Sequence, residues 1–109
     1  MFLTSKHNLV KKKMKISGKQ VTAARDLLGL TQVELAQAAG LSTDTILAFE
    51  AGKTNPYPSS LLKIVSELER RGIEFIDGHT PPSGEDAIGV RLNLSMAAAY
   101  ARAEKGADR

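Results

Sequence analysis

Few side chains in this 109-residue sequence are of types that carry out chemistry. There is no cysteine, which excludes disulfides, thiolate metal sites and cysteine nucleophiles. His79 lies near Asp77, Glu85 and Asp86, but this spacing fits no metal-ligand motif and the segment is polar and rich in proline. No nucleophile stands beside a base, and no two carboxylates converge. We therefore expect no catalytic residues, no metal site, no cofactor and no enzyme activity.

The basic side chains favour an anionic partner instead. The formal net charge is +3, and no Asp or Glu precedes Asp26. The basic residues before it are Lys6, Lys11, Lys12, Lys13, Lys15, Lys19 and Arg25. A basic N-terminal arm of this kind suits a phosphate backbone, and the alternative interpretation is a solvated extension. Met14 offers a second start, so whether residues 1–13 belong to the native chain stays open.

The segment from 17 to 72 predicts four short helices separated by glycines. Their starts are indicated by Ser17, Thr31, Ser42 and Ser59. Their ends are indicated by Gly29, Gly40, Gly52 and Gly72. Within each helix apolar side chains recur at intervals of three and four residues, so each has one face to bury. Arg25 with Asp26, and Glu67 with Arg71, are interpreted as surface ion pairs.

After the fourth helix the pattern changes to strands. Residues 73–76 and 88–92 are β-prone and lie on either side of a proline-containing loop, which predicts an antiparallel ribbon. An isolated ribbon of two strands is marginal unless it packs on another element. The alanine-rich tail predicts a helix with Ser95 as its N-cap and Gly106 beyond its end. So short a helix is stable only when docked.

The most informative segment is TQVELAQAAGLSTDTILAFEAG, residues 31–52. It places two short helices around a turn that contains Gly40. Ala36 is small where the two helices must approach each other, and Ile46 and Phe49 fall on the buried side of the second helix. This is the pattern of a helix-turn-helix, whose second helix enters the major groove of DNA.

The segment resembles the Cro/repressor-like helix-turn-helix family, also called the XRE family. The matching motif positions are Gln32, Ala36, Gly40, Ile46 and Phe49, followed by Glu50 and Gly52. The resemblance extends to the flanking helices and the ribbon, and it covers roughly residues 16–92. It implies a mainly α fold, a lambda-repressor-like bundle of four to five helices with a small C-terminal β-ribbon.

The resemblance also implies double-stranded DNA as the partner, read by the helix from Thr43 to Ala51. The residues expected to contact DNA are Gln32, Ser42, Thr43, Asp44, Thr45, Leu47, Ala48 and Lys53. Many relatives carry basic or amide side chains at the positions of Leu47 and Ala48, whereas this chain does not. Asp44 is repelled by phosphates but can accept a hydrogen bond from cytosine N4. Direct readout is therefore expected to be sparse, with Gln32 clamping a phosphate beside the groove.

These expectations divide the chain into four parts. They are a basic flexible arm (1–15), a helix-turn-helix domain (16–72), a β-ribbon extension (73–94) and a tail helix (95–109). The expected function is sequence-specific DNA binding in transcriptional regulation, as a homodimeric repressor in the cytoplasm. No apolar stretch approaches the length of a membrane span, so no membrane partner is expected.

Three alternatives stay open. We predict dimerisation through the ribbon, by pairing of its free edge or by packing of Phe75, Ile76, Val90 and Leu92 against a second copy. The competing possibility is that these side chains fold back onto their own helices and dimers form only on DNA. The chain is alternatively an antitoxin-like protein-interaction module whose partner is a toxin. A third interpretation is a helix-turn-helix fold that has lost DNA binding.

Overall fold

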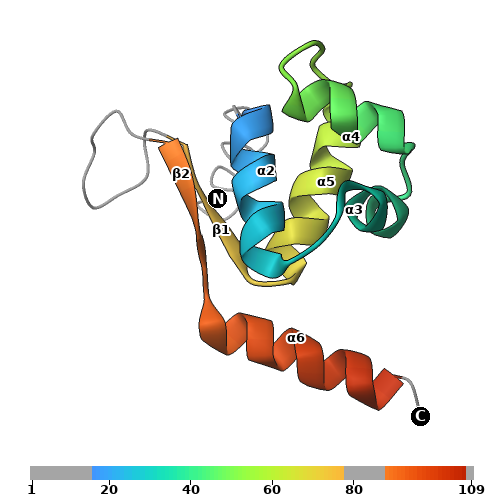
Figure 1. The fold of residues 1–109 in the computed structure, drawn as a ribbon. Helices are drawn as coiled ribbons and strands as arrows, with labels where there is room; N and C mark the ends of the chain where they lie inside the picture. The colour runs from blue at the N-terminus through green and yellow to red at the C-terminus, as the bar shows by residue number, and fades with distance from the viewer. Residues whose placement is uncertain (1–15, 78–87, 108–109) are drawn as a thin grey trace, which may run out of the picture.

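The computed structural model describes residues 16–77 and 88–107, which form five helices and a two-stranded antiparallel sheet (Figure 1). The elements in chain order are α2 (Gly18–Leu28), α3 (Gln32–Ala39), α4 (Thr43–Glu50), α5 (Pro58–Arg70), β1 (Ile73–Asp77), β2 (Ile88–Leu92) and α6 (Leu94–Ala107). The predicted helical bundle with a small ribbon is confirmed. The basic arm up to Lys15, and the segment that holds His79, Glu85 and Asp86, lie outside the described residues.

The helix boundaries follow the capping signals of the sequence. The hydroxyl groups of Ser17, Thr31 and Ser42 each accept a hydrogen bond from a backbone N–H three residues on, at 3.1–3.2 Å. Gly40 ends α3 with a φ of 72°, a left-handed conformation that glycine adopts at no steric cost. The fourth helix begins at Pro58, one residue before the expected start. Proline suits the first helical position because an N–H there would have no partner within the helix.

The core lies where α2, α3, α4 and α5 converge. Its fully buried large side chains are Val21, Leu35, Ile46, Ile64, Leu68 and Ile73. The N-terminus of α2 meets the C-terminus of α4 so closely that a Cβ on Gly18 would lie 2.0 Å from the carbonyl oxygen of Phe49. Only glycine fits at that contact, which fixes α4 against α2 and leaves the opposite face of α4 outside the bundle.

The ribbon is held on α2 of its own chain. Strands β1 and β2 pair in register from Ile73 opposite Leu92 to Asp77 opposite Ile88. The apolar side chains that pack against the helical core are Phe75, Val90 and Leu92. These three side chains therefore fold back onto their own helices, which is the arrangement that competes with the predicted ribbon dimer.

Gln20 joins the ribbon to the first helix through hydrogen bonds. Its side chain is 3% exposed, and its Nε2 donates to the carbonyl oxygens of Ile76 (2.9 Å) and Gly89 (3.0 Å). Its Oε1 accepts from the N–H of Ser17 at 2.9 Å, which completes the capping box of α2. One amide thus caps a helix and anchors two strands.

The tail helix starts and ends at other residues than expected. Ser95 is not the N-cap, because Asn93 Oδ1 accepts from the N–H of Met96 at 3.0 Å and α6 begins at Leu94. The backbone N–H of Asn93 also donates to the carbonyl of Gly72 (2.8 Å), which holds this cap at the foot of the ribbon. Gly106 does not end the helix either, since α6 continues through it to Ala107.

Helix α6 follows β2 and runs below the helical bundle (Figure 1). The guanidinium carbons of Arg70 and Arg71 each lie 4.9 Å from the ring centroid of Tyr100. Arg71 Nε also donates to Glu67 at 2.7 Å. The Glu67–Arg71 pair is therefore not the surface pair that was expected, because Glu67 is buried. No helix in the described part of the chain is long and apolar enough to cross a membrane.

Candidate nucleic-acid interface

The helix pair α3–α4 has the arrangement that the motif predicts. Ala36, Ile46 and Phe49 are all buried at the crossing of the two helices and against the core. The turn between them runs through Gly40 and Leu41 to Ser42, and the N–H of Leu41 donates to the carbonyl of Ala36 at 2.9 Å. With one side of α4 buried by these contacts, its other side is available to a partner.

The exposed side of α4 carries two of the residues that were expected to contact DNA, Asp44 and Leu47. Asp44, Leu47 and Ala51 are exposed and recur at intervals of three and four residues, so they share one face. Leu47 is 44% exposed and lies outside the core cluster. The remaining expected contacts on this helix are half-buried, and they are Thr43, Thr45 and Ala48.

The hydroxyl groups at the start of α4 are already engaged with each other. Ser42 Oγ lies 2.9 Å from Thr45 Oγ1, and it also accepts from the backbone N–H of Thr45 at 3.2 Å. Both side chains are therefore used in capping the helix. The hydroxyl group of Thr43 takes no part in the cap.

Gln32 and Lys53 lie at the two ends of the helix pair. Gln32 begins α3 and is half-buried, whereas Lys53 follows Gly52 after α4 and is exposed. The backbone N–H of Lys53 donates to the carbonyl of Ala48 at 2.9 Å, which fixes where the lysine leaves the helix. The two residues therefore lie on the two elements that a helix-turn-helix presents to a duplex.

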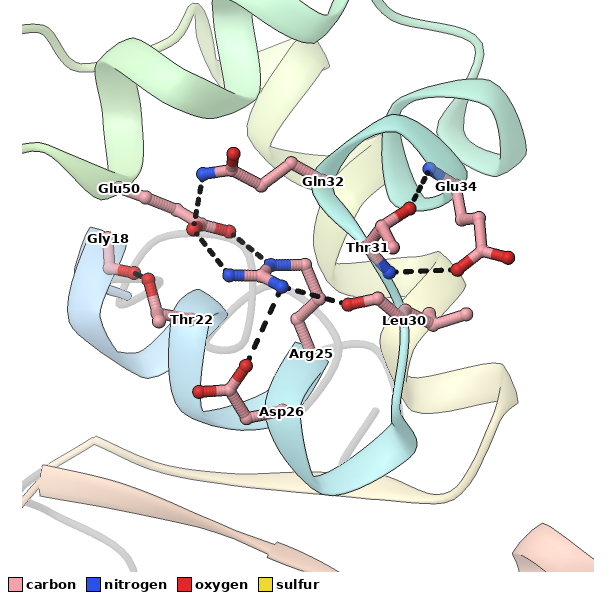
Figure 2. Close-up of polar contacts among 9 residues, drawn as sticks. All are labelled: Gly18, Thr22, Arg25, Asp26, Leu30, Thr31, Gln32, Glu34 and Glu50. Atoms are coloured by element: carbon pink, nitrogen blue, oxygen red, sulfur yellow. Dashed lines mark hydrogen bonds and ion pairs between the residues drawn. The ribbon is translucent and has the colours of Figure 1, made fainter.

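A buried ion pair underlies this surface (Figure 2). Arg25 donates from Nε and Nη2 to the two carboxylate oxygens of Glu50 at 3.0 and 3.1 Å, while its Nη1 donates to the carbonyl of Leu30 at 2.8 Å. Gln32 Nε2 donates to Glu50 Oε1 at 3.0 Å. The Glu50 carboxylate thus links α2, the start of α3 and the end of α4. Asp26, the expected partner of Arg25, lies 3.6 Å from it and is exposed.

The charges in this network keep each other ionised. Burial would raise the pKa of Glu50, but hydrogen bonds from Arg25 and Gln32 outweigh burial and the pKa is lowered overall. The hydrogen bond to Glu50 raises the pKa of Arg25. Gln32 is therefore held by a carboxylate in the free protein, and it retains one amide hydrogen and its carbonyl oxygen for another partner.

Sequence reasoning missed this network because its members are far apart in the chain. Arg25 and Glu50 are separated by 25 positions. Each also has a residue of opposite charge close by in the sequence, Asp26 for Arg25 and Lys53 for Glu50. The motif places Glu50 at the end of the segment without assigning it a partner. Among residues 16–77 and 88–107, no group of three or more His, Cys, Asp or Glu side chains could hold a metal ion.

A capped helix pair with one buried and one presented face, set in a bundle of short helices, defines a helix-turn-helix domain. Residues 21–75 match the helix-turn-helix family, and the chain belongs to this family in its Cro/repressor (XRE) form. The chain is also 32% identical over 81 residues to a Methanocaldococcus jannaschii protein that carries the provisional name of HTH-type transcriptional regulatory protein. That match covers 74% of this chain and 26% of the relative, so the chain spans about a quarter of the relative's length.

Proposed function

We propose that the chain binds double-stranded DNA and regulates transcription. The observation that carries the proposal is the presented face of α4, which stands outside the core on a helix-turn-helix whose other face is buried. The name of the archaeal relative, a transcriptional regulator, supports the same class. In this proposal α4 lies in the major groove and its N-terminal residues meet the base edges.

The remaining expected contacts are assigned to the phosphate backbone. Gln32 would donate its free amide hydrogen to a phosphate, and Lys53 would supply charge at the other end of the pair. The N-terminal arm, residues 1–15, would add sequence-independent contacts. The division into arm, helix-turn-helix domain (16–72), ribbon (73–94) and tail (95–109) is part of this proposal.

The proposed regulator acts as a repressor and occupies its site as a homodimer in the cytoplasm. One helix-turn-helix reads few base pairs, and α4 offers few donors, so adequate specificity requires two half-sites. Because the ribbon's apolar side chains are used within their own chain, the two copies would meet on the duplex rather than through the ribbon face.

Fluorescence anisotropy with labelled genomic fragments at low salt tests DNA binding. We expect binding that weakens steeply as salt rises, because released counterions drive it. Leu47→Glu should abolish binding by placing a negative charge in the groove. Its matched control is Leu27→Glu, which changes a leucine of similar exposure (50%) in the last turn of α2. An absence of binding by the unaltered chain, or equal losses in the two variants, would contradict the proposal.

A second candidate is a protein-interaction module of the antitoxin type. The observation in its favour is the exposed apolar surface at the start of α6, where Leu94 is 75% and Met96 47% exposed. Co-expression with a toxin candidate encoded beside the gene tests it. Co-purification that is lost in Leu94→Asp, with no DNA binding by the chain alone, would favour this function over the first.

A further inference from the structure

The presented face of α4 has an unusual chemical character. Its exposed groups are a carboxylate, Asp44, and an apolar side chain, Leu47, one helical turn apart. The hydroxyl groups of Ser42 and Thr45 are bonded to each other in the helix cap. The helix therefore offers one acceptor and one apolar surface, while its donors are limited to Thr43.

The four bases differ in the hydrogen-bonding and apolar groups that they present to such a face in the major groove. Guanine presents only acceptors, N7 and O6, which repel a carboxylate and make no favourable contact with leucine. Cytosine presents the N4 amino group, which donates to a carboxylate, and thymine presents a 5-methyl group, which packs against an apolar side chain. Adenine presents the N6 donor beside the N7 acceptor, which repels a carboxylate. An acceptor beside an apolar surface thus complements cytosine and thymine and disfavours guanine.

The spacing of the two side chains matches neighbouring base pairs. Three residues of α-helix advance about 4.5 Å along the axis, and successive bases on one strand lie about 3.4 Å apart. Asp44 and Leu47 can therefore address two adjacent steps when α4 lies along the groove. Neither side chain has a hydrogen-bond or core contact among the described residues that would hold it away from this position.

Given the DNA-binding function proposed above, we propose that α4 reads a cytosine and a thymine on adjacent base pairs. Asp44 accepts from cytosine N4, and Leu47 packs against the thymine 5-methyl group. Specificity at this helix is then set by a methyl contact and a carboxylate acceptor, without a basic side chain on guanine.

The test begins with selection of bound duplexes from a random pool, using the full chain. Each thymine of the selected site is then replaced singly by deoxyuridine, which removes the 5-methyl group and leaves base pairing intact. We expect one thymine in each half-site at which deoxyuridine weakens binding about fourfold, the effect of one buried methyl group. In Leu47→Ala this penalty should vanish, whereas in the control Leu27→Ala it should remain.

The same selection also tests the proposed role of Asp44. Asp44→Asn should move the preference at one position from cytosine to adenine, because an asparagine amide bonds adenine N6 and N7 together. Binding without a deoxyuridine penalty, a penalty that persists in Leu47→Ala, or a preference for guanine in place of the cytosine or thymine on the strand that α4 reads, would overturn this inference while leaving DNA binding intact. Failure of the unaltered chain to select any duplex would overturn the proposed function itself.

Discussion

Glu50 is the residue that most strongly joins the three helices around the candidate interface. Its carboxylate is 6% exposed and bonded to Arg25 and Gln32. Removing one member of such a pair leaves the other charge buried, which costs about 3–5 kcal/mol. We therefore expect Glu50→Ala to lower the free energy of unfolding by up to about this amount in urea denaturation at pH 7, because the half-buried Arg25 would keep only the exposed Asp26, 3.6 Å away, as a counter-charge.

The same residue predicts a dependence of stability on pH. The pKa of Glu50 is lowered on folding, so its contribution is fully present above the unfolded pKa, about 4.3. That contribution is lost as the pH falls through the lower folded value. Urea denaturation between pH 7 and pH 2 should show a shallower acid loss in Glu50→Gln than in the unaltered chain. Glu34→Gln is the control, because glutamine preserves the α3 capping box; an identical change in both variants would refute the assignment.

Gln20 makes a prediction about the attachment of the ribbon. Gln20→Glu retains an acceptor for the N–H of Ser17 but replaces two donors with a carboxylate facing the carbonyls of Ile76 and Gly89. We expect the free energy of unfolding to fall by about 1–3 kcal/mol or more. Amide hydrogen exchange measured by NMR should be faster in β1 and β2. Unchanged protection of both strands would contradict the role given to this side chain.

At the scale of elements, local signals were enough to predict the helices. Serine, threonine and glycine caps act within four residues, and they gave the limits of α2, α3 and α4 correctly. The pairing of β1 with β2 followed from two β-prone runs on either side of a loop. The buried ion pair of Arg25 and the double role of Gln20 depend on contacts across 25 to 69 positions, which no local pattern encodes. Asn93 replaced Ser95 as a cap because its backbone is held by Gly72.

Helix α6 makes a prediction about the contacts that dock it. Fourteen residues are too few for a stable isolated helix in water. Its first turn is tied to Gly72 through Asn93, and further along the helix the Tyr100 ring contacts the guanidinium groups of Arg70 and Arg71. Tyr100→Ala should therefore speed amide exchange in α6 beyond its first turn and leave α2 to α5 unchanged. Tyr100→Phe keeps the aromatic face and should retain the protection. Equal exchange in both variants would show that the stacking does not hold the helix.

At the scale of the whole molecule, the ribbon packing predicts how two copies meet. With Phe75, Val90 and Leu92 half-buried against their own core, the free chain has less apolar surface for dimerisation through that face. We expect a monomer at micromolar concentration in sedimentation equilibrium, and two chains on each duplex that holds two half-sites about 34–36 Å apart. A duplex with one half-site should bind a single chain. A free dimer that is lost when the chain is truncated after Gly72 would contradict this account.

The central claim is that the presented face of the helix-turn-helix is the surface that meets DNA. NMR titration of the isotope-labelled full chain with its selected duplex at low salt tests this claim most directly. The account predicts that backbone amide shifts change most around Gln32 and from Ser42 to Lys53, while those of α6 and the buried part of α5 stay in place. Shift changes confined to α6 and the ribbon, or no change anywhere at saturating duplex, would contradict it.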